Sequence, residues 1–327
     1  MWRFYCPSCG IEYPENKYIP FCEKCGGGLE VGGELPERRK ILGEGGTPTV
    51  TEVYKGFEIN FKLEYLNPSG SFKDRGCSYA LYMAKEIGYK TSVVDSSGNT
   101  GLATALYSSR LGMESYIVVP KYASESKKSL IKKVGGILIE TETREGAYEK
   151  AVELSKKYYY VAHQTNPFFL HGMMSIGIEL SDMAEGRDVI IPVSSGSLLL
   201  GLYRGLMEAG SKDFRIIGVQ AVERAPLKDY VKVFGVVGGE SSRYADALLV
   251  KNPRRLREIA SVLKEVDGGI VLVGDNAILD ASEELHRMGF IVEPSSSVVW
   301  AAFKFLVEKD EARDSILVLT GSGLKYL

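Results

Sequence analysis

Four cysteines near the start of the sequence have the spacing of metal ligands. They form two Cys-x-x-Cys pairs, each followed directly by a glycine: Cys6 with Cys9, and Cys22 with Cys25. Two tight turns of this kind supply four thiolates in a tetrahedron, which suits a structural zinc ion. An iron ion can take the same four ligands. Disulfides are the weaker interpretation, because no apolar leader segment directs the protein to an oxidising compartment.

A lysine stands at the start of a predicted helix. Lys73 follows the Gly- and Pro-containing turn of residues 67–72, and residues 76–88 have a helical pattern. The positive end of a helix disfavours an ammonium group, and a neutral amine is what a Schiff-base or proton-moving lysine needs. A solvated lysine in a first helical turn is the simplest interpretation of Lys73 alone. Its neighbours in the fold therefore decide whether a chemical role is indicated.

Two further turns of small polar residues lie between a predicted strand and a predicted helix. The first offers free amides and hydroxyls to a carboxylate, although simple helix capping is an equal alternative; it contains Ser97, Asn99 and Thr100. The second suits a phosphate group and contains Ser194, Ser195, Gly196, Ser197 and Leu198. This second turn has neither the Walker lysine nor a G-x-G-x-x-G pattern, so it does not indicate nucleotide hydrolysis or dinucleotide binding.

A third polar position ends a strand near the C-terminus. Thr320 follows the apolar residues 316–319 and precedes a glycine turn. Its hydroxyl is suited to meet a ring nitrogen buried at the base of a cleft.

The elements that must position these residues indicate an α/β protein. Short β-branched runs alternate with longer amphipathic stretches from residue 41 onward, which is typical of parallel sheets. The clearest strands are residues 91–94, 115–119, 137–139 and 158–161, and the helices between and around them are 76–88, 99–112, 125–135 and 144–157. They predict a small lobe, residues 76–162, with an open sheet of about four strands. A larger lobe would combine residues 34–75 with 163–327, with strands at 189–193, 215–219 and 316–319.

The composition limits the partners. With 40 basic and 42 acidic residues the net charge is −2, so the 327-residue chain lacks the broad positive field that nucleic-acid binding needs. The longest apolar stretch, residues 189–207, is interrupted by Pro192 and Arg204 and does not form a membrane span. We therefore expect a cytoplasmic protein with a small-molecule substrate and neither nucleic acid nor membrane as partner.

The order of these motifs resembles the fold-type-II pyridoxal-phosphate (PLP) enzymes, and the threonine synthase family in particular. The matching segments are residues 43–48, 67–76, 97–101 and 320–325, with the cysteine-rich residues 1–33 resembling that family's N-terminal zinc ribbon. The resemblance implies the two-lobed architecture of the tryptophan synthase β type, each lobe an open, largely parallel sheet flanked by helices. It also implies PLP and zinc as cofactors, an amino-acid substrate and a homodimer.

The same resemblance implies a role for each motif. Lys73 would carry PLP in a Schiff base and move protons, and Asn99 would bind the 3′-oxygen of the cofactor. The loop of residues 194–198 would bind the cofactor phosphate, and Thr320 would face the pyridine nitrogen. The substrate carboxylate would be held by Ser97, Asn99 and Thr100.

The sequence departs from the family pattern at two places. Three serines occupy the usually glycine-rich phosphate loop, where a positive φ would strain them. Phe169 stands where the family usually has an arginine that binds the phosphate of O-phosphohomoserine. The implied activity is conversion of O-phosphohomoserine to threonine and phosphate by elimination and water addition. Phe169 keeps open a PLP lyase or β-replacement enzyme acting on serine, threonine or O-phosphoserine. A non-catalytic PLP-binding relative is a third hypothesis, which the presence of Lys73, Asn99 and Thr320 disfavours.

Overall fold

The computed structural model describes residues 1–326, which divide into two compact units. Unit 1 comprises Met1–Gly45, Asn67–Ser69 and Lys73–Met173; unit 2 comprises Gly46–Leu66, Gly70–Phe72 and the rest of the described chain from Met174. The cysteine-rich segment and residues 163–173 thus belong to the same unit as the smaller sheet. The lobe limits predicted from the sequence pattern stay a prediction.

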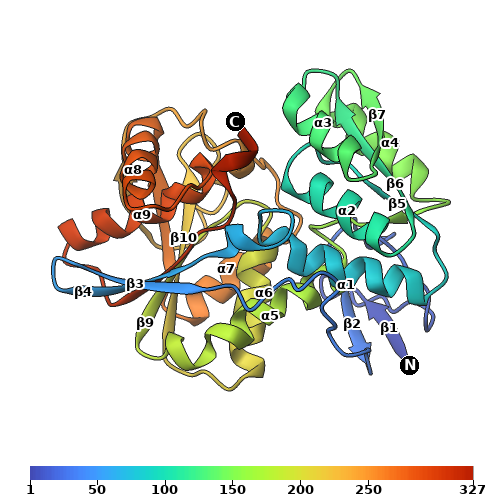
Figure 1. The fold of residues 1–327 in the computed structure, drawn as a ribbon. Coiled ribbons are helices and arrows are strands. Elements are labelled where there is room, and N and C mark those ends of the chain that lie inside the picture. The colour runs from blue at the N-terminus through green and yellow to red at the C-terminus, as the bar shows by residue number, and fades with distance from the viewer. Residues whose placement is uncertain (327) are drawn as a thin grey trace. The chain divides into compact units, whose positions relative to one another are not determined.

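Unit 1 contains the predicted four-stranded parallel sheet, in the order β7-β6-β5-β8. Its strands are β5 (Thr91–Val94), β6 (Glu114–Pro120), β7 (Ile137–Thr141) and β8 (Tyr159–Tyr160). Its helices are α1 (Lys73–Glu86), α2 (Asn99–Arg110), α3 (Glu125–Lys133) and α4 (Arg144–Leu154). The chain steps from β5 to β6 to β7 and then returns to β8 on the other side of β5. Because parallel crossovers are right-handed, α2 and α3 cover one face and α4 the other (Figure 1).

Unit 2 contains a seven-stranded sheet in the order β11-β12-β10-β9-β13-β4-β3. Only the edge strand β3 is antiparallel to its neighbour. The strands are β3 (Thr49–Tyr54), β4 (Phe57–Lys62), β9 (Arg187–Pro192), β10 (Phe214–Ala221), β11 (Val233–Val237), β12 (Gly269–Val273) and β13 (Ser315–Val318). The three predicted strands are confirmed as the central β9, β10 and β13. Strands β3, β4, β11 and β12 were not predicted; β11 contains a glycine and continues into two more, a composition typical of loops.

The helices of unit 2 pack on both faces of this sheet (Figure 1). They are α6 (Ser197–Glu208), α7 (Leu256–Glu265), α8 (Asp275–Arg287) and α9 (Pro294–Glu308), while α5 (Pro167–Ala184) begins in unit 1 and ends here. From β9 the chain moves to β10 and on to the edge strand β11, returns to β12 between them, and then crosses back to β13 on the other side of β9. The strand order therefore reverses between β9 and β13, and ligands of open α/β sheets bind at the carboxyl ends of strands at such a point.

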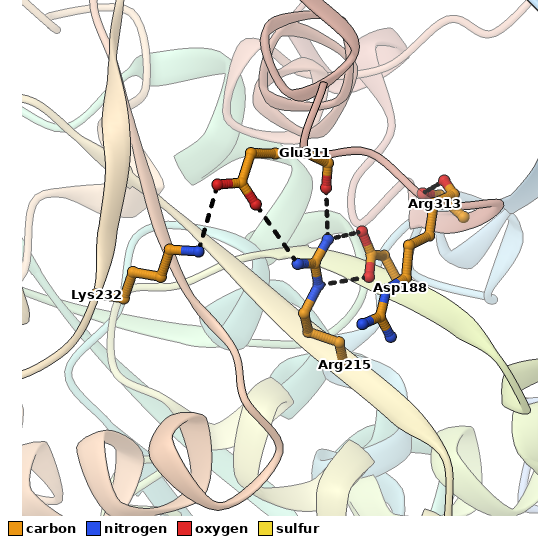
Figure 2. Close-up of polar contacts among 6 residues, drawn as sticks. Asp188, Arg215, Lys232, Glu311 and Arg313 are labelled. Atoms are coloured by element: carbon orange, nitrogen blue, oxygen red, sulfur yellow. Dashed lines mark hydrogen bonds and ion pairs between the residues drawn. The ribbon is translucent and has the colours of Figure 1, made fainter. Parts of the chain in front are cut away.

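The amino ends of β9 and β10 are joined by a buried ion pair (Figure 2). Arg215 donates from Nε and Nη2 to the two carboxylate oxygens of Asp188, each at 2.7 Å, and Nη2 also donates to the Glu311 carbonyl at 2.7 Å. Lys232 lies 3.5 Å from the Glu311 carboxylate. The pair joins β9 to β10 at the edge of the sheet opposite the predicted phosphate loop.

No helix in residues 1–326 is long and apolar enough to cross a membrane.

Candidate active site and metal centre

Lys73 is the first residue of α1, as the sequence predicted from its Gly/Pro turn. The turn is held by Asp74, which is fully buried and accepts hydrogen bonds from the Ser69 amide at 2.6 Å and from the Ser69 hydroxyl. The Tyr107 hydroxyl lies 3.3 Å from the Asp74 carboxylate and 3.2 Å from that of Glu44. Glu44 in turn accepts the amides of the loop before it. This buried network, which no spacing in the sequence indicates, fixes the start of α1.

Phe169 forms an aromatic wall beside Lys73 within unit 1. The Lys73 ammonium nitrogen lies 5.9 Å from the centre of the buried Phe169 ring, a cation–π distance. A side chain on Gly76 would place its Cβ 2.5 Å from that ring, so the glycine permits the close approach. The His163 ring lies edge-on to Phe169 with centroids 6.2 Å apart. Burial, with a smaller effect of the positive charges on Lys73 and Arg144, lowers the pKa of His163 to about 3, so this imidazole is neutral near pH 7.

The loop after β5 presents the predicted carboxylate-binding residues. The N-cap of α2 is Gly98, and no side chain caps this helix, so helix capping does not explain the polar residues of the loop. Thr100 is buried in the first turn of α2. A Cβ at Gly101 would lie 1.9 Å from the Ser96 carbonyl, which shows how tightly the loop folds over the helix start. The start of a helix presents backbone amides and the positive end of its dipole, which favour an anion at this place.

The predicted phosphate loop lies at the carboxyl end of β9 and leads into α6. Gly196 is the N-cap of α6 with φ of 88°, and a Cβ there would lie 2.2 Å from Ile259. Ser194, Ser195 and Ser197 have no positive φ, so the expected strain at these serines is absent. The buried hydroxyls of Ser194 and Ser197 have no hydrogen-bond partner within residues 1–326. Two orphaned hydroxyls beside the free amides of a helix start fit a phosphate group.

Thr320 lies at the same edge of the sheet, because β13 pairs in parallel with β9. It is buried, and its amide donates to the Ser296 hydroxyl at 2.7 Å. Ser296 belongs to the first turn of α9, so this bond fixes the end of β13 against that helix. The role of Ser296 in holding Thr320 is a tertiary contact that the sequence alone did not reveal.

The four predicted metal ligands come together in unit 1. All four sulfur atoms lie within 4.8 Å of one another: those of Cys6, Cys9, Cys22 and Cys25. The Cys6–Cys25 and Cys9–Cys22 sulfur pairs are 3.6 Å apart, too far for disulfides and close to the roughly 3.8 Å edge of a tetrahedron with metal–sulfur bonds of about 2.3 Å. Gly10 and Gly26 have positive φ, as the turns predict. The fifth cysteine, Cys77, is buried in α1 near Thr104 and packs there.

The cysteine cluster is docked on the rest of unit 1 by aromatic contacts. Its strands β1 (Trp2–Tyr5) and β2 (Glu30–Gly33) pair in antiparallel register. The rings of Trp2 and Phe4 meet Phe168 at centroid distances of 4.8 and 5.0 Å. Phe168 directly precedes Phe169, so the cluster packs against the residue adjoining the wall beside Lys73.

Comparison with known proteins decides the family. Residues 41–321 match the family described as pyridoxal-phosphate dependent enzyme. The chain belongs to that family. This PLP enzyme is similar to the threonine synthase of Methanosarcina acetivorans, with 27% identity. The alignment is 375 positions long, gaps included, and covers 99% of this chain and 91% of the relative. It is also similar to the threonine synthase of Bacillus sp. strain ULM1, with 31% identity over 301 residues, 87% of this chain and 84% of the relative. The predicted resemblance is confirmed.

Solved structures agree on the fold of this PLP enzyme. O-ureido-L-serine synthase has a TM-score of 0.74 with 23% identity, and the match covers 89% of this chain and 94% of that one. Maize serine racemase has a TM-score of 0.72 with 24% identity, covering 85% and 88%. At these identities the likeness establishes the α/β fold alone.

Proposed function

We propose that this chain is a PLP-dependent threonine synthase, which converts O-phosphohomoserine and water to threonine and phosphate. The observation that carries the proposal is the 31% identity to a curated threonine synthase over 87% of the chain. The residues that would hold the cofactor and the substrate carboxylate are present at the starts of α1, α2 and α6 and at the end of β13, whereas the usual phosphate-binding arginine is Phe169.

Two groups of residues in unit 2 would hold the cofactor. The orphaned hydroxyls of Ser194 and Ser197, with Ser195, Gly196 and Leu198, would bind the phosphate at the start of α6. The hydroxyl of Thr320 would meet the pyridine nitrogen. When bound, PLP supplies an electron sink for carbanions formed at the substrate. A neutral hydroxyl partner leaves the ring nitrogen largely unprotonated, which tempers that sink and favours elimination over transamination.

In unit 1, Lys73 would hold the cofactor through Nζ, and its amine would move protons at the substrate. Asn99 would bond the 3′-oxygen of the cofactor, and Ser97, Asn99 and Thr100 would hold the substrate carboxylate at the start of α2. The proton transfers all need one mobile base, and Lys73 at a helix N-terminus is suited to be neutral at the required step.

The aromatic wall favours one alternative. Phe169 puts an apolar ring beside Lys73 where the family pattern expects an arginine, and a lost bidentate anion clamp weakens phosphate binding. A lyase or β-replacement enzyme acting on serine, threonine or O-phosphoserine needs no γ-phosphate clamp. This second candidate uses the same lysine and carboxylate loop.

The cysteine cluster would bind one structural zinc ion. Its four sulfur atoms are spaced for a closed tetrahedral site, which leaves no position for a substrate. We also propose a cytoplasmic location, as the sequence pattern indicates, and a homodimer, as the family resemblance implies.

The test is turnover of O-phosphohomoserine by PLP-loaded protein, with release of phosphate and formation of threonine measured together. Threonine and phosphate in equal amounts, abolished in Lys73→Ala, are the expected result. Absence of both products, with activity on serine, threonine or O-phosphoserine instead, would favour the second candidate.

A further inference from the structure

The segment that leads directly into Lys73 is paired with the C-terminal part of unit 2. The Phe72 amide donates to the Thr320 carbonyl at 3.0 Å, and the Ser322 amide donates to the Gly70 carbonyl at 2.9 Å. An isolated antiparallel bridge lies between these two bonds. Residues 70–72 are thus held like a short strand, and the next residue of the chain is Lys73.

A second segment flanks the C-terminal part from its other side. The Glu293 amide donates to the Gly321 carbonyl at 2.9 Å, and the Gly323 amide donates to the Ile291 carbonyl at 3.0 Å. The Glu293 carboxylate packs directly on Gly321, where a Cβ would lie 2.3 Å from its Cδ. Glycine at this position is what allows a carboxylate to be buried there.

Lys325 joins all three segments. Its ammonium group donates to the Gly70 carbonyl at 2.8 Å and lies 4.0 Å from a carboxylate oxygen of Glu293. The side chains are 13% and 3% exposed, so the positive charge offsets a carboxylate that would be costly to bury alone. The Cδ and Cε atoms of Lys325 also lie 3.6 Å from where a Cβ on Gly70 would stand, beside a backbone with φ of 79°.

We propose that Lys325 is a positioning residue for Lys73. Its charge-assisted hydrogen bond to the Gly70 carbonyl, balanced by Glu293, fixes the segment of residues 70–72 and so the place where Lys73 leaves it. This inference rests on the proposed function, in which Lys73 carries the cofactor. Displacing a catalytic group by about 1 Å lowers the reaction rate on the order of 100-fold. Loss of the single hydrogen bond from Lys325 to Gly70 can therefore have a large effect on the rate.

The test compares the wild-type protein with Lys325→Met, Lys325→Arg and a control, Lys304→Met, all saturated with PLP. Lys304 also pairs with a glutamate of unit 2, Glu284, at 2.6 Å, and its side chain is 22% exposed. Three properties are measured: the absorbance of the lysine-bound cofactor, the kcat and KM of the proposed reaction with O-phosphohomoserine, and hydrogen exchange of the peptide that contains residues 70–72. The exchange is also measured without PLP, so it does not depend on activity.

We expect Lys325→Met to lower kcat by about 10- to 100-fold with less than about a threefold change in KM. It should also shift the cofactor absorbance and raise exchange in residues 70–72. Lys325→Arg should recover most of kcat, and Lys304→Met should change none of the three properties. Unchanged kcat and exchange in Lys325→Met would overturn the proposal, as would a loss matched by Lys304→Met.

Failure of the proposed function and failure of the positioning role give different results. A wild-type protein without cofactor absorbance would refute the proposed function, whereas altered absorbance and kcat confined to Lys325→Met would support the positioning role. If Lys325→Met does not fold, Lys325→Arg and Lys325→Gln decide: the proposal requires lower kcat and faster exchange in the glutamine variant than in the arginine variant.

Discussion

Ser194 and Ser197 each bury a hydroxyl that has no partner within residues 1–326. A buried hydroxyl without a hydrogen bond costs about 1–3 kcal/mol, and a charged acceptor such as a phosphate would recover that free energy. The two serines replace glycines of the family pattern, yet the structure gives the positive φ to Gly196 alone among residues 194–198. The substitution adds donors without backbone strain.

We expect Ser194→Ala and Ser197→Ala each to raise the Kd for PLP by about 5- to 50-fold, since each removes one bond to a charged group. The stability of the PLP-free protein should be unchanged or higher, because no existing bond is lost. Equilibrium titration of PLP and urea unfolding measure the two effects. Ser115→Ala is the matched control, because Ser115 also buries an unpartnered hydroxyl but in β6; it should leave the Kd unchanged.

His163 makes the stability of the PLP-free protein sensitive to acid. Its pKa is lowered in the folded state from 6.5 to about 3, so the folded state resists protonation that the unfolded chain accepts. The contribution of neutral His163 to the free energy of unfolding is therefore complete above pH 6.5 and is lost as the pH falls toward 3. Between pH 7 and about pH 5 the loss amounts to about 2 kcal/mol.

We expect His163→Gln to remove that part of the pH dependence, while His286→Gln, at an exposed position, leaves it intact. Urea unfolding of the three proteins at pH 7 and at about pH 5 measures the difference. Equal pH dependence in the wild type and His163→Gln would show that His163 is not buried in the neutral form.

At the scale of elements, the cysteine cluster is coupled to the start of α5. Its aromatic residues Trp2 and Phe4 pack on Phe168, so we expect loss of the metal to weaken this docking contact. Small modules of this size are commonly unfolded without their metal.

We expect one zinc ion per chain, lost in Cys9→Ser and retained in Cys77→Ala. Removal of the metal by a chelator should expose Trp2 and shift its fluorescence to the red. The measurement uses a Trp300→Phe background, because the chain has two tryptophans and Trp300 lies in α9. Retention of the metal by Cys9→Ser, or an unchanged emission after chelation, would contradict the account.

Elements with strong local signals were predictable. The strand–turn–helix units around residues 95–101 and 192–199 were found because β-branched runs, small turn residues and helical periodicity agree there. The paired strands β3 and β4 and the glycine-containing β11 depend on partners far along the chain, and their local pattern is weak. For the same reason the sequence indicated the candidate site residues but not their supports, such as Glu44 and Tyr107 around Asp74, or Ser296 behind Thr320.

At the scale of the whole molecule, the residues that stabilise unit 2 and the candidate cofactor-binding residues lie at opposite ends of its strands. The carboxyl ends of β9 and β13 carry the candidate phosphate loop and Thr320, whereas the amino ends of β9 and β10 carry the pair of Asp188 and Arg215 (Figure 2). Burial raises the pKa of Asp188, and the adjacent Arg215 opposes that rise.

We expect Asp188→Asn to lower the free energy of unfolding by about 3–5 kcal/mol, because it removes the carboxylate that neutralises the buried Arg215 and leaves only that of Glu311 at 4.0 Å. Replacing both partners with apolar residues should cost less than that single change. Glu283→Gln, which breaks an exposed pair with Arg287, should cost at most about 1 kcal/mol. Urea unfolding measures these free energies. Equal losses of unfolding free energy in Asp188→Asn and Glu283→Gln would contradict the stabilising role of the buried pair.

If Lys73 carries PLP, chemical reduction should fix the cofactor to this side chain irreversibly. The PLP-loaded protein is reduced with borohydride and digested, and the modified peptide is identified by mass spectrometry. We expect one phosphopyridoxyl group per chain, on Lys73, and none in Lys73→Ala. Stable attachment to another lysine, or none to the wild-type protein, would contradict it.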